Sequence, residues 1–403
     1  MTINVLYVTR NGLLEPLGQS QVFAYLRGLS RDHAITLITY EKDADRADRA
    51  AMEQMRARCR ELGIRWLPQR FRSLPRVLAA VYVPMQLLSL IRRTVRRYDI
   101  RLIHARSYVP AAAAMVVGKC AGVPFIFDMR ALWPEELVTA GRLRRGSVLH
   151  RAIVAMERAC LQRAAAVVSL THAAAAHLRA TYPRETGTQR ISVIPTCVDL
   201  DRFTSASAPV PGDEPQVIGC LGTVLSGWFR MDWFCTFVTV VSRENSGARF
   251  AITTRDDAAR VYEALGPALA DRVTIRSARP EDIPSILRRE QTSVMFYAGG
   301  NTSELGRSPT RLGEILGCGK PVIANAGVGD VARIVEDYRI GVLARDGSEA
   351  AMLEAWHGLQ GLLTDPDLAA RCRRAAEEVF SLDAGTRSYR EIYRAVTQAD
   401  ARQ

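Results

Sequence analysis

The sequence predicts an α/β protein with two domains, each a parallel sheet covered by helices. The chain has 403 residues, which is longer than one hydrophobic core usually supports. Short apolar segments alternate with helix-like segments along its whole length. A stretch rich in Pro, Ala and Ser at 205–215 separates two such runs and has the composition of a linker. We therefore expect domains at 1–205 and 214–380.

The first run alternates strand patterns with helix patterns. Its predicted strands are 4–9, 33–40, 64–67, 100–104, 124–129, 165–170 and 191–194. The clearest predicted helices, 76–97 and 111–121, each stand before or between strands. Such spacing is typical of parallel strands joined by helical crossovers.

The second run continues in the same way. Its predicted strands are 217–221, 249–253, 273–275, 292–298 and 321–324. The helix before the last strand has the strongest start signals in the chain, because Ser308 suits the N-cap and Pro309 the first helical position. We expect this helix to end at Gly319.

This helix is the most informative segment for function. A helix N-terminus presents unpaired N–H groups and partial positive charge to whatever lies before it. Ser308, Thr310 and Arg311 at its start could hold a diphosphate, and Glu314 could hold sugar hydroxyls. The alternative is an ordinary solvated pair of Arg311 and Glu314, three residues apart.

Composition indicates the cellular setting of the protein and argues against a secreted or membrane-spanning chain. The eight cysteines are scattered without a CxxC pair, which favours a reduced cytoplasmic setting and no metal site. The first residues read as a strand, so we expect no secretory signal. The longest apolar stretch, 77–91, contains Pro84 and is too short to span a bilayer. We expect a cytoplasmic protein, peripheral at the inner membrane face.

The positive charge is concentrated in the first half. Residues 1–200 carry 30 Lys/Arg against 15 Asp/Glu, a net of +15. The remaining residues carry 24 against 27, a net of −3, which restores the total of +12. A surface that binds anionic lipid or a phosphorylated acceptor would explain the excess positive charge in the first half of the chain. No nucleic-acid-binding motif accompanies the charge, so we expect no nucleic acid.

Four segments in order resemble a family 4 glycosyltransferase. They are 99–108 (DIRLIHARSY), 122–130 (GVPFIFDMR), 194–203 (IPTCVDLDRF) and 314–323 (EILGCGKPVI). The third is similar to the family's "IPNGVD…F" signature and the fourth to its "EAMACGxPVI" motif. The resemblance implies the GT-B architecture, with two Rossmann-like domains facing each other across a cleft. It also implies that a C-terminal helix at about 385–403 returns to the first domain.

The donor site departs from the family pattern. Glu314 matches the family's second glutamate, which contacts the ribose, but Gly306 stands eight residues earlier where the first is usual, and Glu304 is two off register. The family's phosphate loop here begins at Gly222, with Thr223 where an Arg is usual. Arg230 or Arg311 could supply the missing charge, since a guanidinium fork suits phosphate oxygens.

The first domain carries a variant reaction centre. The family histidine after strand 124–129 is replaced, and Asp128 and Arg130 occupy the region. Carboxyl ends of parallel strands bind ligands in such folds, so we take these two with His104 as catalytic candidates. The alternatives are a structural Asp128–Arg130 pair and a His104 that is simply a satisfied polar group. Gly18, after the first strand, suits close backbone approach or a turn in a donor-binding loop.

The resemblance implies a hexosyltransferase that takes a nucleotide-diphosphate sugar as donor substrate and needs no further cofactor or metal. It implies transfer with retention to a glycan or polyprenyl-linked acceptor, for surface polysaccharide synthesis. Two alternatives are a sugar-nucleotide epimerase of the same fold and a non-catalytic partner subunit. The epimerase would have no acceptor, and the partner subunit would explain the missing glutamate.

Overall fold

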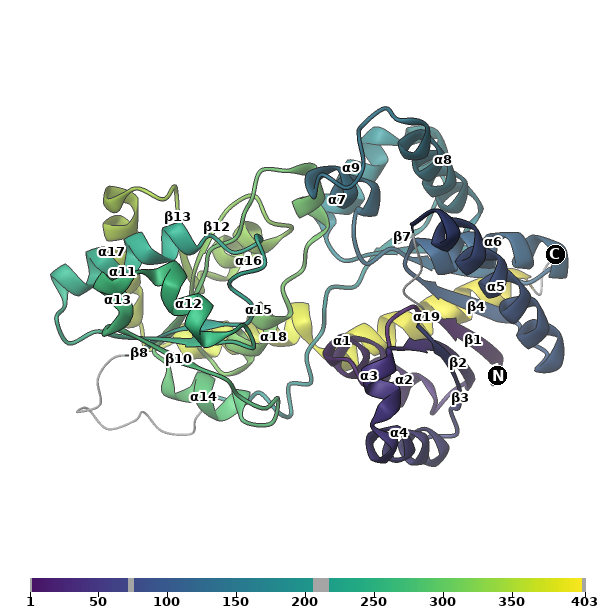
Figure 1. Cartoon of the computed structure of the whole chain (residues 1–403), viewed down its shortest axis with the longest axis horizontal. Coiled ribbons are helices and arrows are strands. Elements are labelled where there is room, and N and C mark those ends of the chain that lie inside the picture. Colours follow the sequence, from purple (N-terminus) through teal and green to yellow (C-terminus); the bar gives the residue numbers. More distant parts are fainter. Residues whose placement is uncertain (1, 72–75, 206–216, 401–403) are drawn as a thin grey trace. The chain divides into compact units, whose positions relative to one another are not determined.

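The computed structural model describes residues 2–71, 76–205 and 217–400 of the chain. Contacts divide the chain into two compact units. Unit 1 comprises Met1–Pro195 and Leu382–Gln403, and unit 2 comprises Thr196–Ser381. Each unit is a parallel sheet with helices packed around it (Figure 1). The predicted fold class, two parallel-sheet α/β domains, is confirmed.

Unit 1 holds a parallel sheet with the strand order β3-β2-β1-β4-β5-β6-β7 among the described residues. The strands are β1 (Asn4–Val8), β2 (Ala34–Glu41), β3 (Arg65–Arg70), β4 (Leu102–Arg106), β5 (Phe125–Asp128), β6 (Ala166–Ser169) and β7 (Ile191–Val193). The order reverses between β1 and β4, and the carboxyl ends of β1, β4 and β5 are therefore neighbours. Ligands bind at such a switch point in doubly wound folds.

The helices of unit 1 connect these strands. They are α1 (Pro16–Gly18), the π-helix η1 (Gln19–Phe23), α2 (Ala24–Leu29), α3 (Asp43–Ala47), α4 (Arg49–Glu61), α5 (Arg76–Arg97), α6 (Tyr108–Ala121), α7 (Trp133–Thr139), α8 (Val148–Arg163), α9 (His172–Thr181), α10 (Pro183–Thr186) and α19 (Leu382–Asp400). Ser147 and Thr171 cap α8 and α9 through side-chain oxygens, which fixes where those helices begin. The C-terminal α19 packs against α2.

Unit 2 holds a parallel sheet with the order β10-β9-β8-β11-β12-β13 among the described residues. Its strands are β8 (Val217–Leu221), β9 (Arg249–Thr253), β10 (Val273–Arg276), β11 (Thr292–Met295), β12 (Val322–Asn325) and β13 (Gly341–Ala344). Its helices are α11 (Met231–Glu244), α12 (Ala258–Leu265), α13 (Pro267–Ala270), α14 (Ile283–Arg289), the 3₁₀ helix η2 (Thr302–Gly306), α15 (Thr310–Gly317), α16 (Val331–Tyr338), α17 (Glu349–Leu363) and α18 (Leu368–Phe380). Here the order reverses between β8 and β11.

Two boundaries differ from the sequence prediction. The first domain was expected to end at 205, but 196–205 belongs to unit 2 because Val198, Leu200 and Phe203 are buried in its core. The predicted linker lies, except for Ser205, outside the described residues. Ser308 was expected to cap the next helix, but α15 begins at Thr310 with Pro309 at its N-cap position. The Ser308 side chain instead bonds Thr196.

Candidate functional site

The candidate catalytic residues of unit 1 lie together at the carboxyl edge of β4 and β5. The Tyr393 hydroxyl lies 2.7 Å from Nδ1 of His104, and Oδ2 of Asp128 lies 3.3 Å from Nε2. Tyr389 donates a hydrogen bond of 3.2 Å to the same carboxylate oxygen. Both tyrosines come from α19, so this network ties the C-terminal helix to the sheet.

Electrostatics fix the protonation of the network. Burial alone would raise the pKa of Asp128, but the Arg130 cation and the hydrogen bond from His104 outweigh it and hold that pKa well below its usual range. Burial lowers the pKa of His104 against the opposing effect of Asp128, so the ring is neutral at pH 7. Because an ionised carboxylate only accepts, Nε2 of His104 carries the proton and Nδ1 accepts from Tyr393.

Arg130 is the one of these predicted residues that reaches the surface. Its side chain is 9% exposed, against 0% for His104 and 1% for Asp128. It lies 3.4 Å from Oδ1 of Asp128 and donates to Gln21 at 3.4 Å. Its φ of 42° is a left-handed conformation that costs a non-glycine residue about 1–3 kcal/mol and is concentrated at functional sites. Arg130 can therefore touch a ligand, whereas both ring nitrogens of the buried His104 have partners.

In unit 2 the loop after β8 holds the side chain of Arg311 close to its backbone. Gly222 has a φ of 101°, and a Cβ there would lie 2.2 Å from an Arg311 guanidinium nitrogen. The Arg311 guanidinium carbon also lies 5.5 Å from the centroid of the Tyr297 ring. Among the described residues no carboxylate lies within ion-pair distance of Arg311. This loop therefore presents a cation without an internal counter-charge.

Three amides of the same loop are already used. Oδ2 of Asp256 accepts from the backbone N–H groups of Val224 and Leu225 at 2.6 and 3.0 Å. The Gly222 N–H bonds the carbonyl of Thr253 at 2.8 Å. Since these donors are occupied by protein oxygens, a diphosphate at this loop would depend on Arg311 more than on the backbone.

Glu314 lies one turn further along α15. Its side chain is half-buried, and within the described part of the chain it has no hydrogen bond or ion pair. Burial raises its pKa, and the nearby Arg311 opposes that rise. The solvated Arg311–Glu314 pair considered from the sequence is therefore absent, and both side chains keep their capacity for a ligand.

Glu304, which lies two residues from the position of the missing first glutamate, forms an ion pair within the protein. It is buried and forms an ion pair of 2.7 Å with Arg307. The Arg307 guanidinium carbon in turn lies 4.0 Å from the centroid of a Trp228 ring. Burial raises the pKa of Glu304 against the effect of Arg307. This carboxylate is paired with Arg307 at the end of the η2 turn.

The remaining predicted residues fall into different settings. Arg230 forms an exposed ion pair of 2.6 Å with Asp232, so Arg311, and not Arg230, lies against the Gly222 loop. Thr223 is exposed in that loop, and Thr310 is half-buried at the start of α15. Gly18 serves close backbone approach and not a left-handed turn, because a Cβ there would lie 1.9 Å from the Gly12 carbonyl oxygen.

Sequence reasoning missed three kinds of side chain that shape these edges. Asp256 reads as an ordinary helix start in the run 254–258, and Tyr297 as part of a strand. Arg106 reads as one cation among many. The useful signal for Arg106 and Asp128 was positional, because each ends a buried strand. The described residues contain no group of three or more His, Cys, Asp or Glu arranged to hold a metal ion, and none of their helices is long and apolar enough to cross a membrane.

Comparison with known protein families identifies the family of this chain. The model of Glycosyltransferase Family 4 matches residues 19–202, and the model of Glycosyl transferases group 1 matches residues 215–361. The chain belongs to glycosyltransferase family 4. It is thus a glycosyltransferase, an enzyme of the EC 2.4 class, as the motifs predicted.

Individual relatives agree with this assignment. The glycosyltransferase is 27% identical over 285 residues to 2-deoxystreptamine glucosyltransferase of Streptomyces kanamyceticus. The alignment covers 66% of this chain and 68% of the relative. Its fold is similar to sucrose-phosphate synthase of Thermosynechococcus elongatus, with a TM-score of 0.70, 16% identity and coverage of 98% and 100%. It is also similar to Anabaena Alr3699/HepE in complex with UDP and glucose, with a TM-score of 0.66, 14% identity and coverage of 96% and 98%. These two structures identify the fold as GT-B.

Proposed function

We propose that unit 2 binds a nucleoside-diphosphate sugar and that the enzyme transfers this sugar, with retention, to an acceptor bound by unit 1. The observation that carries the donor assignment is Arg311, a cation that lies close to Gly222 and to the Tyr297 ring and has no ion-pair partner among the described residues. Such a preorganised cation stabilises the charge that develops on a leaving diphosphate. Glu314, one turn away and without a partner, is suited to the ribose hydroxyls. A relative of the same fold is known in complex with UDP and glucose, which supports a sugar nucleotide as donor.

Arg130 is proposed as the acceptor-side residue. A guanidinium does not act as a general base, because its pKa stays above about 12. Its role would be to orient the acceptor or to stabilise charge, with Asp128 holding it in place. His104, buried and bonded at both nitrogens, would act only through Asp128.

A binding and product assay tests this function. Purified enzyme is titrated with UDP, ADP, GDP and dTDP and then incubated with the matching hexose donors and candidate acceptors. We expect one nucleoside diphosphate to bind and its donor to be consumed only when an acceptor is present. Release of a free sugar from donor alone would favour the epimerase, and no binding or turnover would favour the partner subunit. NMR of the product gives the anomeric configuration, and inversion would refute retention.

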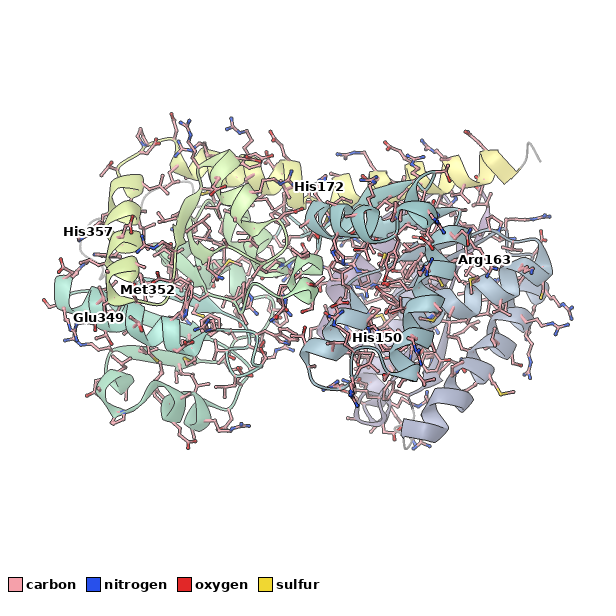
Figure 2. The ribbon with its side chains drawn as sticks, turned by 90° about the horizontal axis from the view of Figure 1, so that it is seen from above. His150, Arg163, His172, Glu349, Met352 and His357 are labelled. Atoms are coloured by element: carbon pink, nitrogen blue, oxygen red, sulfur yellow. The ribbon has the colours of Figure 1, made fainter. Side chains whose placement is uncertain are left out.

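We further propose that unit 1 works at an anionic membrane. Helices α5, α6 and α8 pack side by side, and their residues include a single acid, Glu157, which is buried (Figure 1). In Figure 2 the labelled His150 and Arg163 mark the two ends of α8 within this layer. Exposed apolar side chains stand on all three helices: Met85, Val116, Val148 and Leu149. Exposed cations without ion pairs among the described residues accompany them: Arg92, Arg93, Arg96, Arg97, Lys119 and Arg151.

A layer with cations, apolar side chains and no exposed acid is suited to a phospholipid surface. Each cation near an anionic bilayer contributes about 1 kcal/mol, and salt screens it. A lipid-linked glycan or polyprenyl acceptor would be reached there, which would fit a role in surface polysaccharide synthesis.

Vesicle binding tests the membrane assignment. Replacing the four exposed arginines of α5 with Gln should lower binding to phosphatidylglycerol vesicles without changing nucleotide affinity. The matched control replaces four exposed arginines of unit 2 with Gln and changes the net charge equally: Arg255, Arg260, Arg289 and Arg374. Equal losses in the two variants would mean that net charge alone acts. A wild-type protein that ignores these vesicles at low salt would refute the membrane proposal.

A further inference from the structure

Two guanidinium groups, one buried and one largely buried, lie near a single carboxylate at the carboxyl edge of unit 1. Arg106 ends β4 and lies opposite Asp128 in the sheet register, and Arg130 follows β5. Arg130 is the partner of Asp128 at 3.4 Å. Arg106 is 6% exposed and has no ion pair within the described residues. A buried cation without a counter-charge is costly, so this arrangement needs a reason.

The neighbours of Arg106 do not supply the missing charge. Arg106 donates a hydrogen bond of 3.4 Å to the neutral Asn11 amide oxygen, which is long for a guanidinium. It also forms a side-chain hydrogen bond with the neutral Tyr7. Burial and the neighbouring Arg130 both lower the pKa of Arg106, although a guanidinium keeps its proton at neutral pH. The Nε atoms of Arg106 and Arg130 are both buried without a hydrogen-bond partner. The two cations thus present N–H donors in excess of the acceptors around them.

The edge is also partly exposed on one side. Asn11 and Arg130 are only partly buried, and they stand next to Arg106 and Asp128 respectively. Planar guanidinium forks bind tetrahedral oxyanions through paired N–H···O contacts more strongly than they bind neutral groups.

We propose that Arg106 and Arg130 form an oxyanion site in unit 1 that binds a phosphate group of the acceptor. The inference rests on the proposed function in one respect, that unit 1 binds the acceptor. It names the acceptor class: a sugar phosphate or a lipid-linked sugar whose phosphate enters between Arg106 and Arg130. The second positive charge, left over after Asp128 has neutralised the first, pairs with the anion.

The test separates this site from the donor site. Pyrophosphate binding is measured by calorimetry in an Arg311→Ala background, at constant ionic strength set with chloride. We expect residual binding, and we expect Arg106→Gln in the same background to weaken it by roughly 10- to 100-fold, as loss of charged hydrogen bonds predicts. Arg101→Gln is the matched control, because Arg101 immediately precedes β4, is exposed and is paired with Asp99 at the opposite end of that strand from Arg106.

The outcomes do not depend on transfer activity. Absence of pyrophosphate binding in the Arg311→Ala protein, or binding that Arg106→Gln leaves unchanged, would overturn the site. If Arg106→Gln fails to fold, Arg106→Lys keeps the charge but loses the fork, and a loss of roughly 3- to 10-fold is expected. Glucose 1-phosphate and phosphatidic acid vesicles then distinguish the sources. Binding that depends on Arg106 in either arm supports the site, and independence in both refutes it.

Discussion

Asp128 at the carboxyl edge of unit 1 and the Arg311 and Glu314 side chains of unit 2 are opposite cases of charged side chains. In unit 1 the carboxylate of Asp128 is used by His104, Arg130 and Tyr389, and almost none of it is exposed. In unit 2 Arg311 and Glu314 stand one turn apart, and neither has an ion-pair partner among the described residues. A charge that the fold has already neutralised has little left for a ligand, whereas an unpaired charge on a helix start can bind one.

The difference teaches that charged side chains near the carboxyl edge of a sheet can have two roles, one in holding the fold together and one in binding a ligand. Asp128 holds α19 on the sheet through Tyr389, and His104 does so through Tyr393, so these residues are first of all structural. Arg311 is held by the Gly222 backbone and an aromatic ring, which orient it without neutralising it. Mutations of Asp128 and His104 should therefore affect mainly stability, and mutations of Arg311 mainly donor chemistry.

The largest expected effect is on stability in unit 1. Asp128→Ala leaves Arg130 buried without its carboxylate, and removing one partner of a buried pair costs about 3–5 kcal/mol. We expect a lower denaturation midpoint and faster hydrogen exchange in α19, which urea titration and mass spectrometry would measure. Asp43→Ala, which removes an exposed pair with Arg70, is the control and should change little. If Asp128→Ala is as stable as the wild type, the network is not structural.

The next effect concerns catalysis in unit 2. Arg311→Ala should reduce turnover by roughly 10²–10³-fold, the scale for losing one preorganised group that stabilises developing charge. Its thermal stability should stay near that of the wild type, because Arg311 has no ion pair to lose. Arg230→Ala tests the competing assignment, and since Arg230 is exposed and paired with Asp232, it should have much less effect. Equal losses of turnover in the two variants would contradict the site.

A buried carboxylate of unit 2 sharpens the contrast with Asp128. Glu290 is paired with Arg276 at 2.9 Å, yet burial raises its pKa to about 7, because Arg276 is partly exposed and compensates only in part. Because the pKa of Glu290 is higher in the folded state than in the unfolded state, the contribution of Glu290 to the free energy of unfolding is highest below pH 4.5. This contribution falls as the pH rises to about 7. The fall amounts to about 3 kcal/mol at most.

Urea midpoints from pH 5 to 8 measure this effect. Glu290→Gln should reduce the loss of stability across that range, because a carboxamide does not ionise. Asp128 acts in the opposite direction, since its lowered pKa gives stability that is lost only when the pH falls through the acid range. A Glu290→Gln protein with the wild-type pH profile would show that Glu290 titrates normally.

The smallest expected effect is on nucleotide affinity. Glu314→Ala should weaken binding of the cognate nucleoside diphosphate by roughly 10- to 150-fold, equivalent to about 1.5–3 kcal/mol for a charged hydrogen bond to the ribose. Titration calorimetry measures it, with the exposed Glu349 of α17 replaced by Ala as control. Unchanged affinity in Glu314→Ala would remove this residue from the donor site.

The sequence by itself determined the α/β class, most strands and the positions of the loops that we propose as ligand sites. Apolar periodicity and turn residues act locally, so strands such as 217–221 and 249–253 were predicted with the bounds that the structure has. The motif that contains Glu314 was also readable, because its glycines and proline are needed where they stand. Strand β13 was not predicted, and the boundary at 205 was ten residues too late because 196–205 packs by tertiary contacts.

Only the tertiary structure decided which charges are neutralised. Asp128 and Tyr389 are hydrogen-bonded although they are 261 residues apart in the chain, and no local sequence pattern predicts that pair. The same holds for Asp256, which reaches the amides of Val224 and Leu225 from the next strand's loop. Ion pairing and desolvation depend on distance in space, so the sequence named the titratable groups, whereas the fold decided which of them a ligand can use.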